Sequence, residues 1–556
     1  MYFCCMKRIF NQNPILSIIL ISGLFFIPFL GKVHLFDWDE VNFAEISREM
    51  IASNNYMQPQ INYMPFYEKP PLFMWMQVLS MKVFGINEFA ARFPNAIFGI
   101  IVLCSLFVIG KRHFSTRMAW FWVLSMGASL TPHFYFKTGL IDPVFNFFIF
   151  HAIYSFCYLF IWKENSTRQN ILQTFLSALF TALAVMTKGP VAIILIVGTL
   201  GFAWILLKFK NLPNIGYTIL WIPMVLFLSG LWFAYETHLH GSKYMNEFIT
   251  YQIRLFQTED AKHGGTLLFH PIALLLGCFP ASIFMWSAFK KDIPLTSPFN
   301  TIFYKVMLSC FIVVLVVFSL VQTKIIHYSS MDYYPITFFS ALGLAYLTKE
   351  SLSFNKIQVF LLGFIGCIWS IALIFTPFAG LNLEKIKPFI HDANFLNQLE
   401  TPIEWNAWAS LFGIIFAGIY FYELFLFRKK QIQKAVILLF VACVFCIQTV
   451  MLYYIPRIEK MVQGALIEFC QEHKTEDANQ CALYMKSYAM FYYSERKPFE
   501  NVEDTFKHLH YLYQPIQKDC YFFLRTIDTA KLDYSMGPKT YKMYNKNGFT
   551  FYKREK

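Results

Sequence analysis

The feature that most constrains this chain is a series of long apolar runs. A helix needs about twenty mostly apolar residues to cross the hydrocarbon core of a bilayer, and such runs recur from the amino terminus to the last quarter of the sequence. The predicted spans are residues 14–31, 94–110, 117–132, 144–162, 171–187, 190–207, 216–234, 267–289, 304–321, 333–348, 356–377, 406–427 and 435–455. The fold class predicted is a mostly α-helical, polytopic membrane protein of about 13 transmembrane helices.

The composition agrees with this class and argues against nucleic-acid binding. Hydrophobic residues make up 56% of the chain and charged residues 15%, whereas soluble domains carry about 25% charged residues. The 47 Lys and Arg exceed the 34 Asp and Glu and give a net charge of +13. These basic residues lie in short connections between apolar runs, as the positive-inside rule expects, so we expect membrane lipids and no nucleic acid as partners.

The basic residues also predict how the chain is oriented. They occur in alternate connections, at Lys7 and Arg8, Lys111 to Arg117, Lys163 and Arg168, Lys208 and Lys210, Lys290 and Lys291, Lys349 and Lys356, and Arg428 to Lys434. With thirteen spans all of these connections lie on one side, which places the amino terminus in the cytoplasm. The opposite, periplasmic side then receives a long first loop and the C-terminal tail.

Two regions follow from this arrangement. Residues 1–455 are predicted to form the transmembrane domain, with a large first periplasmic loop at 32–93, and residues 456–556 to form a small periplasmic α/β domain. The tail is charged throughout and contains stretches typical of strands, CALYMKSYAMFYY and CYFFLRTID. Three of its residues are cysteines, and a disulfide between two of them is left open.

The first loop carries more charge than expected so close to a bilayer, at Asp37, Asp39, Glu40, Glu45, Arg48, Glu49, Glu68 and Lys69. A plain connector needs only about two to eight residues, so we interpret this loop as one wall of an active site. Within it, residues 40–51 alternate apolar and polar side chains at helical spacing. This pattern predicts an amphipathic helix that lies flat on the membrane interface.

Acidic residues kept near a membrane usually face a cavity, which singles out Asp39 and Glu40. The alternative is that both are hydrated residues that cap the following helix. Asp142, in LIDPVF, is either a helix cap followed by proline or a second carboxylate that faces Asp39. Two carboxylates around one substrate are suited to accepting a proton or holding a cationic group.

Four cations lie on the side that the topology leaves poor in basic residues: Lys69 in YEKPP, Lys188 in MTKGP, Arg254 in YQIRLF and Lys324 in TKIIHY. Each could be a long side chain that reaches the interface, but together they favour binding of a phosphate. His263 and His327 show no paired metal-ligand spacing such as HExxH, which favours structural or solvent-facing roles, and a divalent metal cofactor is left open. The sequence contains no nucleotide-binding loop, so an activated donor must supply the energy.

Six motifs occur in a fixed order between the spans: DEVNFAEISREMIAS, FYEKPPL, LIDP, VMTKGP, YQIRLF and TKIIHY. With them the chain resembles the bacterial lipid A aminoarabinose transferases, relatives of the protein O-mannosyltransferases with a GT-C fold. The resemblance implies an inverting transfer of a sugar from undecaprenyl phosphate to an acceptor such as lipid A, at the periplasmic face of the bacterial inner membrane.

The resemblance also implies roles for individual residues. The expected catalytic residues are Asp39, Asp142 and Glu68. The expected substrate-binding residues are Glu40, Lys69, Lys188, Arg254, Lys324 and Tyr328. The sequence departs from the family at Asn42, where an arginine is common, and at Ile326, where a proline is common. Because both positions are expected near the sugar, another amino sugar or a neutral hexose is left open.

Two other functions fit parts of the pattern. A related enzyme could act on protein or glycan hydroxyls with the same fold and most of the same cations. A lipid or polysaccharide transporter would also need a polar cavity, but it predicts charges along the spans, whereas here they concentrate at one face. A signalling or assembly protein that works through its tail is a further alternative.

Overall fold

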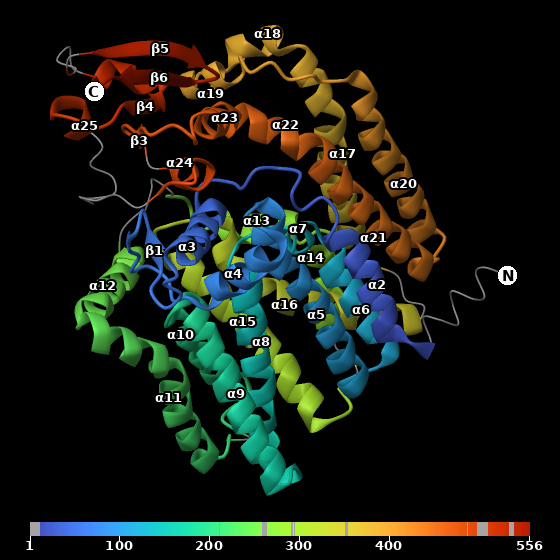
Figure 1. The fold of residues 1–556 in the computed structure, drawn as a ribbon. Coiled ribbons are helices and arrows are strands. Elements are labelled where there is room, and N and C mark those ends of the chain that lie inside the picture. Colours follow the sequence, from blue (N-terminus) through green and yellow to red (C-terminus); the bar gives the residue numbers. More distant parts are fainter. Residues whose placement is uncertain are drawn as a thin grey trace.

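The computed structural model describes residues 12–210, 212–257, 264–290, 293, 295–350, 354–485, 487–497, 510–532, 537 and 539–556. The chain is mostly helical, with one four-stranded sheet near the C-terminus. Figure 1 shows a bundle of helices whose end near α3 is covered by the C-terminal elements, with the sheet farthest from the bundle. His263, considered above as a metal ligand, lies outside the described residues.

Among the described residues, eight helical segments are long and apolar enough to cross a membrane, or up to nine if the bent pair Phe269–Gly277 and Ala281–Phe289 is one span. The eight are α5 (Glu88–His113), α8 with η1 (Asp142–Glu164), α9 (Thr167–Lys188), α11 (Ile215–His240), α15 (Pro298–Leu320), α17 (Lys356–Leu381), η5 with α20 (Ala407–Arg428), and the run from α21 through α23 (Ile432–Glu472). This confirms a helical protein with many spans.

The other predicted spans also fall on helices, but on shorter ones. They are α2 (Pro14–Phe26), α6 (Thr116–Gly127), α10 (Val191–Leu206), α16 (Tyr333–Lys349) and the bent pair, in which α13 (Phe269–Gly277) turns by 106° into α14 (Ala281–Phe284) and η2 (Met285–Phe289). A count of thirteen spans therefore stays a prediction.

The first loop folds into two helices and a small hairpin: α3 (Asp39–Ser53), β1 (Gln60–Ile61), β2 (Met64–Pro65) and α4 (Leu72–Phe84). The helix predicted over residues 40–51 is confirmed as α3. The prediction that it lies flat on the interface is wrong, because every residue from Glu40 to Met50 is buried. Helix α4 and the C-terminal α24 (Ala489–Tyr493) pack against it.

Helix α3 can be buried because its charges are paired inside the protein. Arg48 Nε lies 2.7 Å from Glu45 Oε2, and the Glu49 carboxylate accepts hydrogen bonds from the amides of Asn62 and Tyr63 at 2.6 and 2.7 Å. Buried charges are tolerated when they are paired and hydrogen-bonded. The charges of this loop therefore anchor α3 rather than keeping it in water.

The C-terminal sheet has the strand order β3-β4-β6-β5, with β3 parallel to β4 and the other pairs antiparallel. Its strands are β3 (Asn479–Ala482), β4 (Cys520–Arg525), β5 (Thr540–Lys546) and β6 (Phe549–Arg554). The second predicted strand stretch is confirmed by β4, but the first ends at Ala482 and its aromatic part forms α24. The described tail cysteines, Cys470, Cys481 and Cys520, are buried free thiols.

Polar contacts fix the C-terminal region over the start of the first loop. His34 Nδ1 lies 3.1 Å from Glu459 Oε1, and Leu35 donates its amide to the Tyr493 hydroxyl at 2.7 Å. Gln463 Nε2 donates to the Leu35 carbonyl at 2.8 Å. The segment that leads into Asp39 is thus held between the membrane helices and the tail.

Candidate active site

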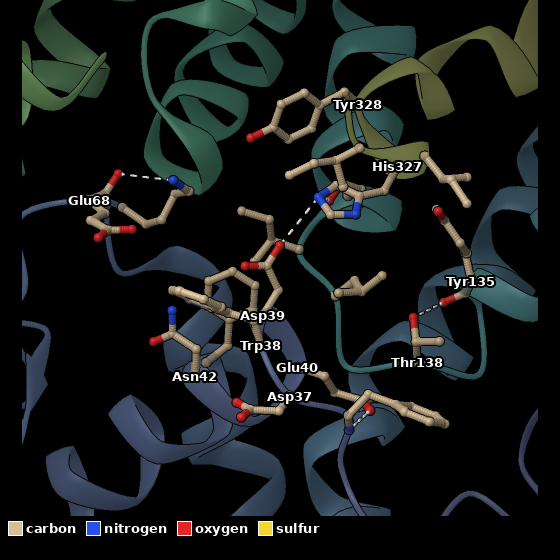
Figure 2. Close-up of a pocket in the computed structure, with 18 of the residues that line it drawn as sticks. Asp37, Trp38, Asp39, Glu40, Asn42, Glu68, Tyr135, Thr138, His327 and Tyr328 are labelled. Carbon is tan, nitrogen blue, oxygen red and sulfur yellow. Dashed lines mark hydrogen bonds and ion pairs between the residues drawn. The ribbon is translucent and has the colours of Figure 1, made fainter. Parts of the chain in front are cut away.

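A cavity of about 1020 Å³ lies where the first loop, the membrane helices and the C-terminal region meet. Its walls come from the start of α3, the loop before α4, the start of α8, the end of α9 and η3 (Ile326–Asp332), with Arg525 and Phe549 from the tail. Figure 2 shows Asp39 near its centre, with Glu68, His327 and Tyr328 around it. Segments far apart in the sequence therefore share one cavity.

Asp39 points across the cavity toward His327 (Figure 2). Its Oδ2 lies 3.3 Å from His327 Nε2, and the same nitrogen is 4.0 Å from Asp142 Oδ2. Burial would raise the pKa of Asp39, but the hydrogen bond from His327 and the charges of His327 and Lys69 outweigh it and lower the pKa below its usual value. Asp39 is therefore a carboxylate at neutral pH.

Asp142 and Lys188 form an ion pair at the cavity wall. Lys188 Nζ lies 2.6 Å from Asp142 Oδ1, and the two side chains are 14% and 4% exposed. Asp142 is the first residue of α8 and is followed by Pro143. The helix dipole favours a carboxylate at this N-terminal position. Lys188 is the last residue of α9, and Gly189 ends the helix with φ of +95°, which favours glycine.

Lys69 also lines the cavity. Its Nζ is 3.4 Å from both the Glu68 carbonyl and the Tyr251 hydroxyl, and 4.7 Å from the centre of the Tyr251 ring. Both hydrogen bonds are long, so the ammonium keeps donor capacity for an anion. Burial lowers the pKa of Lys69 from its usual value, although Glu68 opposes this shift.

Arg254 is exposed and lines a second cavity of about 270 Å³. The two cavities share Phe66, Glu68 and Tyr251, and Arg254 lies 5.1 Å from the centre of the Tyr251 ring. It belongs to α12 (Lys243–Gln257), which ends at the limit of the described residues. A ligand that extended from the main cavity along Tyr251 would therefore meet Arg254.

Tyr328 lines the main cavity beside Lys188, whose Nζ lies 5.1 Å from the centre of its ring. It directly follows His327 in η3, so both aromatic side chains enter the cavity from one short segment (Figure 2).

Two further predicted substrate-binding residues, Glu40 and Lys324, have protein partners for their charged groups, as Lys188 does. The Glu40 carboxylate accepts hydrogen bonds from Arg92 at 2.7 and 2.8 Å and from the amides of Phe36 and Gly139. Lys324 Nζ donates to the carbonyls of Ser319 and Val321 at 2.6 and 2.5 Å and of Phe318 at 3.3 Å, which caps the end of α15. Both line the cavity, and their contact with substrate stays a prediction.

The sequence motifs do not single out several polar residues of the cavity, among them Asp37, Tyr251 and Arg525. For His327 they favour a structural or solvent-facing role. The available signals were the position of Asp37 two residues before Asp39 and of His327 directly before Tyr328; Arg525 gave none, because it lies in a distant strand. Burial raises the pKa of Asp37 to about 6. The described residues contain no group of three His, Cys, Asp or Glu placed to hold a metal ion.

Comparison with known proteins agrees with the resemblance that the six motifs indicate. The family model "Dolichyl-phosphate-mannose-protein mannosyltransferase" matches residues 68–233. In overall structure the chain is similar to ArnT from Cupriavidus metallidurans, in the crystal structure bound to undecaprenyl phosphate, with a TM-score of 0.74, 15% identity and 98% of both chains covered. The chain therefore has the fold of ArnT and is a multi-pass membrane protein.

Two relatives of similar sequence carry one name, undecaprenyl phosphate-alpha-4-amino-4-deoxy-L-arabinose arabinosyl transferase. That of Shewanella sediminis is 28% identical over 284 residues, which is 50% of each protein. The second such protein of Proteus mirabilis is 24% identical over 425 residues, 73% of this chain and 72% of that protein. These similarities confirm the resemblance to the aminoarabinose transferases.

Proposed function

We propose that this chain is an integral membrane glycosyltransferase. It moves a sugar, aminoarabinose or another amino sugar, from undecaprenyl phosphate to lipid A at the periplasmic face of the inner membrane. The observation that carries the proposal is one cavity that joins Asp39, the Asp142–Lys188 pair and Lys69. Because one fold can host many functions, these residues support the reaction more directly than the shape of the chain.

The membrane arrangement proposed has thirteen spans with the amino terminus in the cytoplasm. It has a transmembrane domain over residues 1–455 and a periplasmic α/β domain over residues 456–556. The basic residues in alternate connections support this orientation. The cavity then opens on the periplasmic side, where the first loop and the tail enclose it.

The donor phosphate binds to cations in this proposal. Lys69 and Lys188 approach it in the main cavity and Arg254 in the adjoining one, with Tyr328 beside Lys188. During transfer the bond between the anomeric carbon and the phosphate oxygen breaks, and its electron pair stays on undecaprenyl phosphate. Lysine and arginine stabilise the charge that develops there.

The carboxylates bind the sugar of the donor in this proposal. Asp39 and Asp142 both lie within 4.0 Å of His327 Nε2, and Glu68 lines the same cavity. An amino group on the sugar carries a positive charge at neutral pH, and a carboxylate that is already ionised is its natural partner. The acids thus select and orient an amino sugar.

The acceptor decides whether a base is needed. A lipid A phosphate is already an anionic nucleophile, so Asp39 would only orient the reactants. A sugar, serine or threonine hydroxyl would lose its proton as it attacks, and Asp39 would accept that proton. The hydroxyl-dependent enzyme is the second candidate function, and the ionised state of Asp39 supports it as well.

Mass spectrometry of intact lipid A tests the proposal. Lipid A from cells that contain the gene should carry an added amino-sugar mass on a phosphate, and lipid A from cells without the gene should lack it. Reintroducing the gene with Lys69→Met should give less of the modified species than the wild-type gene. Identical lipid A with and without the gene would reject lipid A as the acceptor.

A further inference from the structure

His327 occupies the middle of the carboxylate cluster, although neither the motifs nor the similar proteins assign it a role. Its Nε2 lies 3.3 Å from Asp39 Oδ2 and 4.0 Å from Asp142 Oδ2, and its side chain is 11% exposed, toward the cavity. At these distances and in partial burial, charges interact strongly. A change in the charge of the imidazole is therefore felt by both carboxylates.

The backbone of His327 is tied to the helix that carries Asp142. Ser330 Oγ donates to the His327 carbonyl at 2.5 Å, and Asn146 Nδ2, from α8, donates to Ser330 Oγ at 2.7 Å. These bonds hold η3 against α8, so the backbones that carry His327 and Asp142 keep their relative positions.

The charges around His327 nearly balance. Asp39 and Asp142 carry two negative charges, and the ammonium of Lys188 pairs with one of them at 2.6 Å. Counted over Asp39, Asp142 and Lys188 alone, a neutral imidazole leaves about one negative charge and an imidazolium leaves none. Lys69 also acts on Asp39, and in the proposed function its ammonium binds the donor phosphate. Protonation of His327 therefore removes about one unit of negative charge that would attract a sugar ammonium. Histidine is the side chain whose charge ordinarily changes between pH 5 and 8.

We propose that His327 determines specificity for the donor sugar: by its protonation it sets the net charge of the Asp39–Asp142 cluster and makes the binding of a cationic amino sugar depend on pH. This inference rests on the proposed function, because it needs a sugar that carries an amine. A donor with a neutral sugar would not sense the change in the same way.

His327 shares its surroundings with other titratable groups. Asp39, Asp142 and His270 interact with it. The same cavity is also lined by Asp37, Glu68 and Lys69 from the first loop, Tyr135, Lys188 from α9, Tyr251 from α12, Lys324, Tyr328 and Arg525 from β4. Among the described residues, α15 and the residue after it contribute only the apolar Phe318 and Val321 to the cavity lining, and α16 contributes no residue. Neither helix therefore places a titratable group in the cavity. Burial raises the pKa of Asp37 to about 6, so its protonation acts in the same pH range and must be separated from that of His327.

The experiment measures the KM of the purified full-length enzyme in lipid vesicles between pH 5.5 and pH 8. Two donors are compared, undecaprenyl phosphate bearing an amino sugar and the same lipid bearing the hydroxyl analogue. The ratio of interest is the KM for the amino-sugar donor divided by the KM for the hydroxyl analogue. For the wild type this ratio should rise roughly tenfold as the pH falls, since the cluster loses about one unit of negative charge. The phosphodiester of the donor keeps one charge throughout.

Histidine variants then assign the effect. In His327→Gln and His327→Asn the KM ratio should change less than twofold over the same range, while the exposed control His391→Asn should behave as the wild type. Asp37→Asn should keep most of the wild-type rise. A wild-type rise that persists in both His327 variants, or that disappears in Asp37→Asn, overturns the proposal, as does loss of all turnover in both folded His327 variants. Absence of transfer from either donor by the wild type would instead reject the proposed function.

Discussion

Lys188 Nζ lies 2.6 Å from Asp142 Oδ1, so two residues with separate predicted roles form one largely buried ion pair. The pair joins the end of α9 to the start of α8 at the wall of the cavity. Its consequence is that a change in Lys188 also changes the environment of Asp142, and the two must be tested together.

A double-mutant cycle on Lys188 and Asp142 should show strong coupling. Lys188→Met and Asp142→Asn should each lower kcat/KM more than tenfold, because each removes one charged group from the cavity and leaves its partner unpaired. Breaking the pair should also destabilise the fold by about 3–5 kcal/mol. The double variant should be no worse than the worse single variant. The same cycle on the exposed pair Lys518 and Asp477 is the control and should show no coupling. If the free-energy losses calculated from kcat/KM for the two single variants simply add in the double variant, Lys188 and Asp142 do not act as a pair.

Glu40 and Asp39 are adjacent in sequence but should respond differently to loss of charge. Glu40→Gln leaves the buried Arg92 guanidinium without its carboxylate, which should destabilise the fold by about 3–5 kcal/mol. Asp39→Asn should cost less stability than Glu40→Gln, since the Asp39 side chain is 38% exposed to the cavity, although its lowered pKa means that the ionised carboxylate contributes some stability. The measurement is the Tm of the detergent-solubilised protein. Equal Tm values for Glu40→Gln and the wild type would contradict the structural role of Glu40.

Lys69 should matter for the donor phosphate. In Lys69→Met the KM for the donor should rise about tenfold or more, because a charge-assisted hydrogen bond to phosphate contributes roughly 1.5–3 kcal/mol. Lys474→Met is the matched control, since Lys474 pairs with Glu495 on the exposed surface of the tail. An unchanged donor KM in Lys69→Met, measured with saturating acceptor, would remove Lys69 from the phosphate site.

Asp37 should make stability depend on pH. Burial raises its pKa to about 6 in the folded protein from an ordinary value of 3.8. The folded state therefore binds a proton more tightly than the unfolded state, and this contribution to stability is complete below about pH 4 and is lost as the pH rises through 6. The Tm of the wild type should fall more between pH 5 and pH 7.5 than that of Asp37→Asn. Parallel Tm curves for the two proteins would refute the prediction.

The helical membrane class of the chain and its charged first loop can be read from the sequence alone. Apolar runs report on spans directly, because the bilayer imposes their length and composition. The motifs also indicated most charged residues of the cavity, among them Asp39, Lys69 and Asp142. These signals come from residues close together in the chain, so they can be recognised in one sequence without knowledge of the fold.

Which charged side chains face the cavity depends on the tertiary packing of the helices. The amphipathic pattern of residues 40–51 indicated a helix, but the packing of α4 and α24 buried it, and its charges became internal pairs. Glu40 pairs with Arg92, 52 residues away, and His327 approaches Asp39 from a distant segment. Partners so far apart in the chain leave no spacing in the sequence, because their contact depends on how the helices pack, and packing is a property of the whole fold.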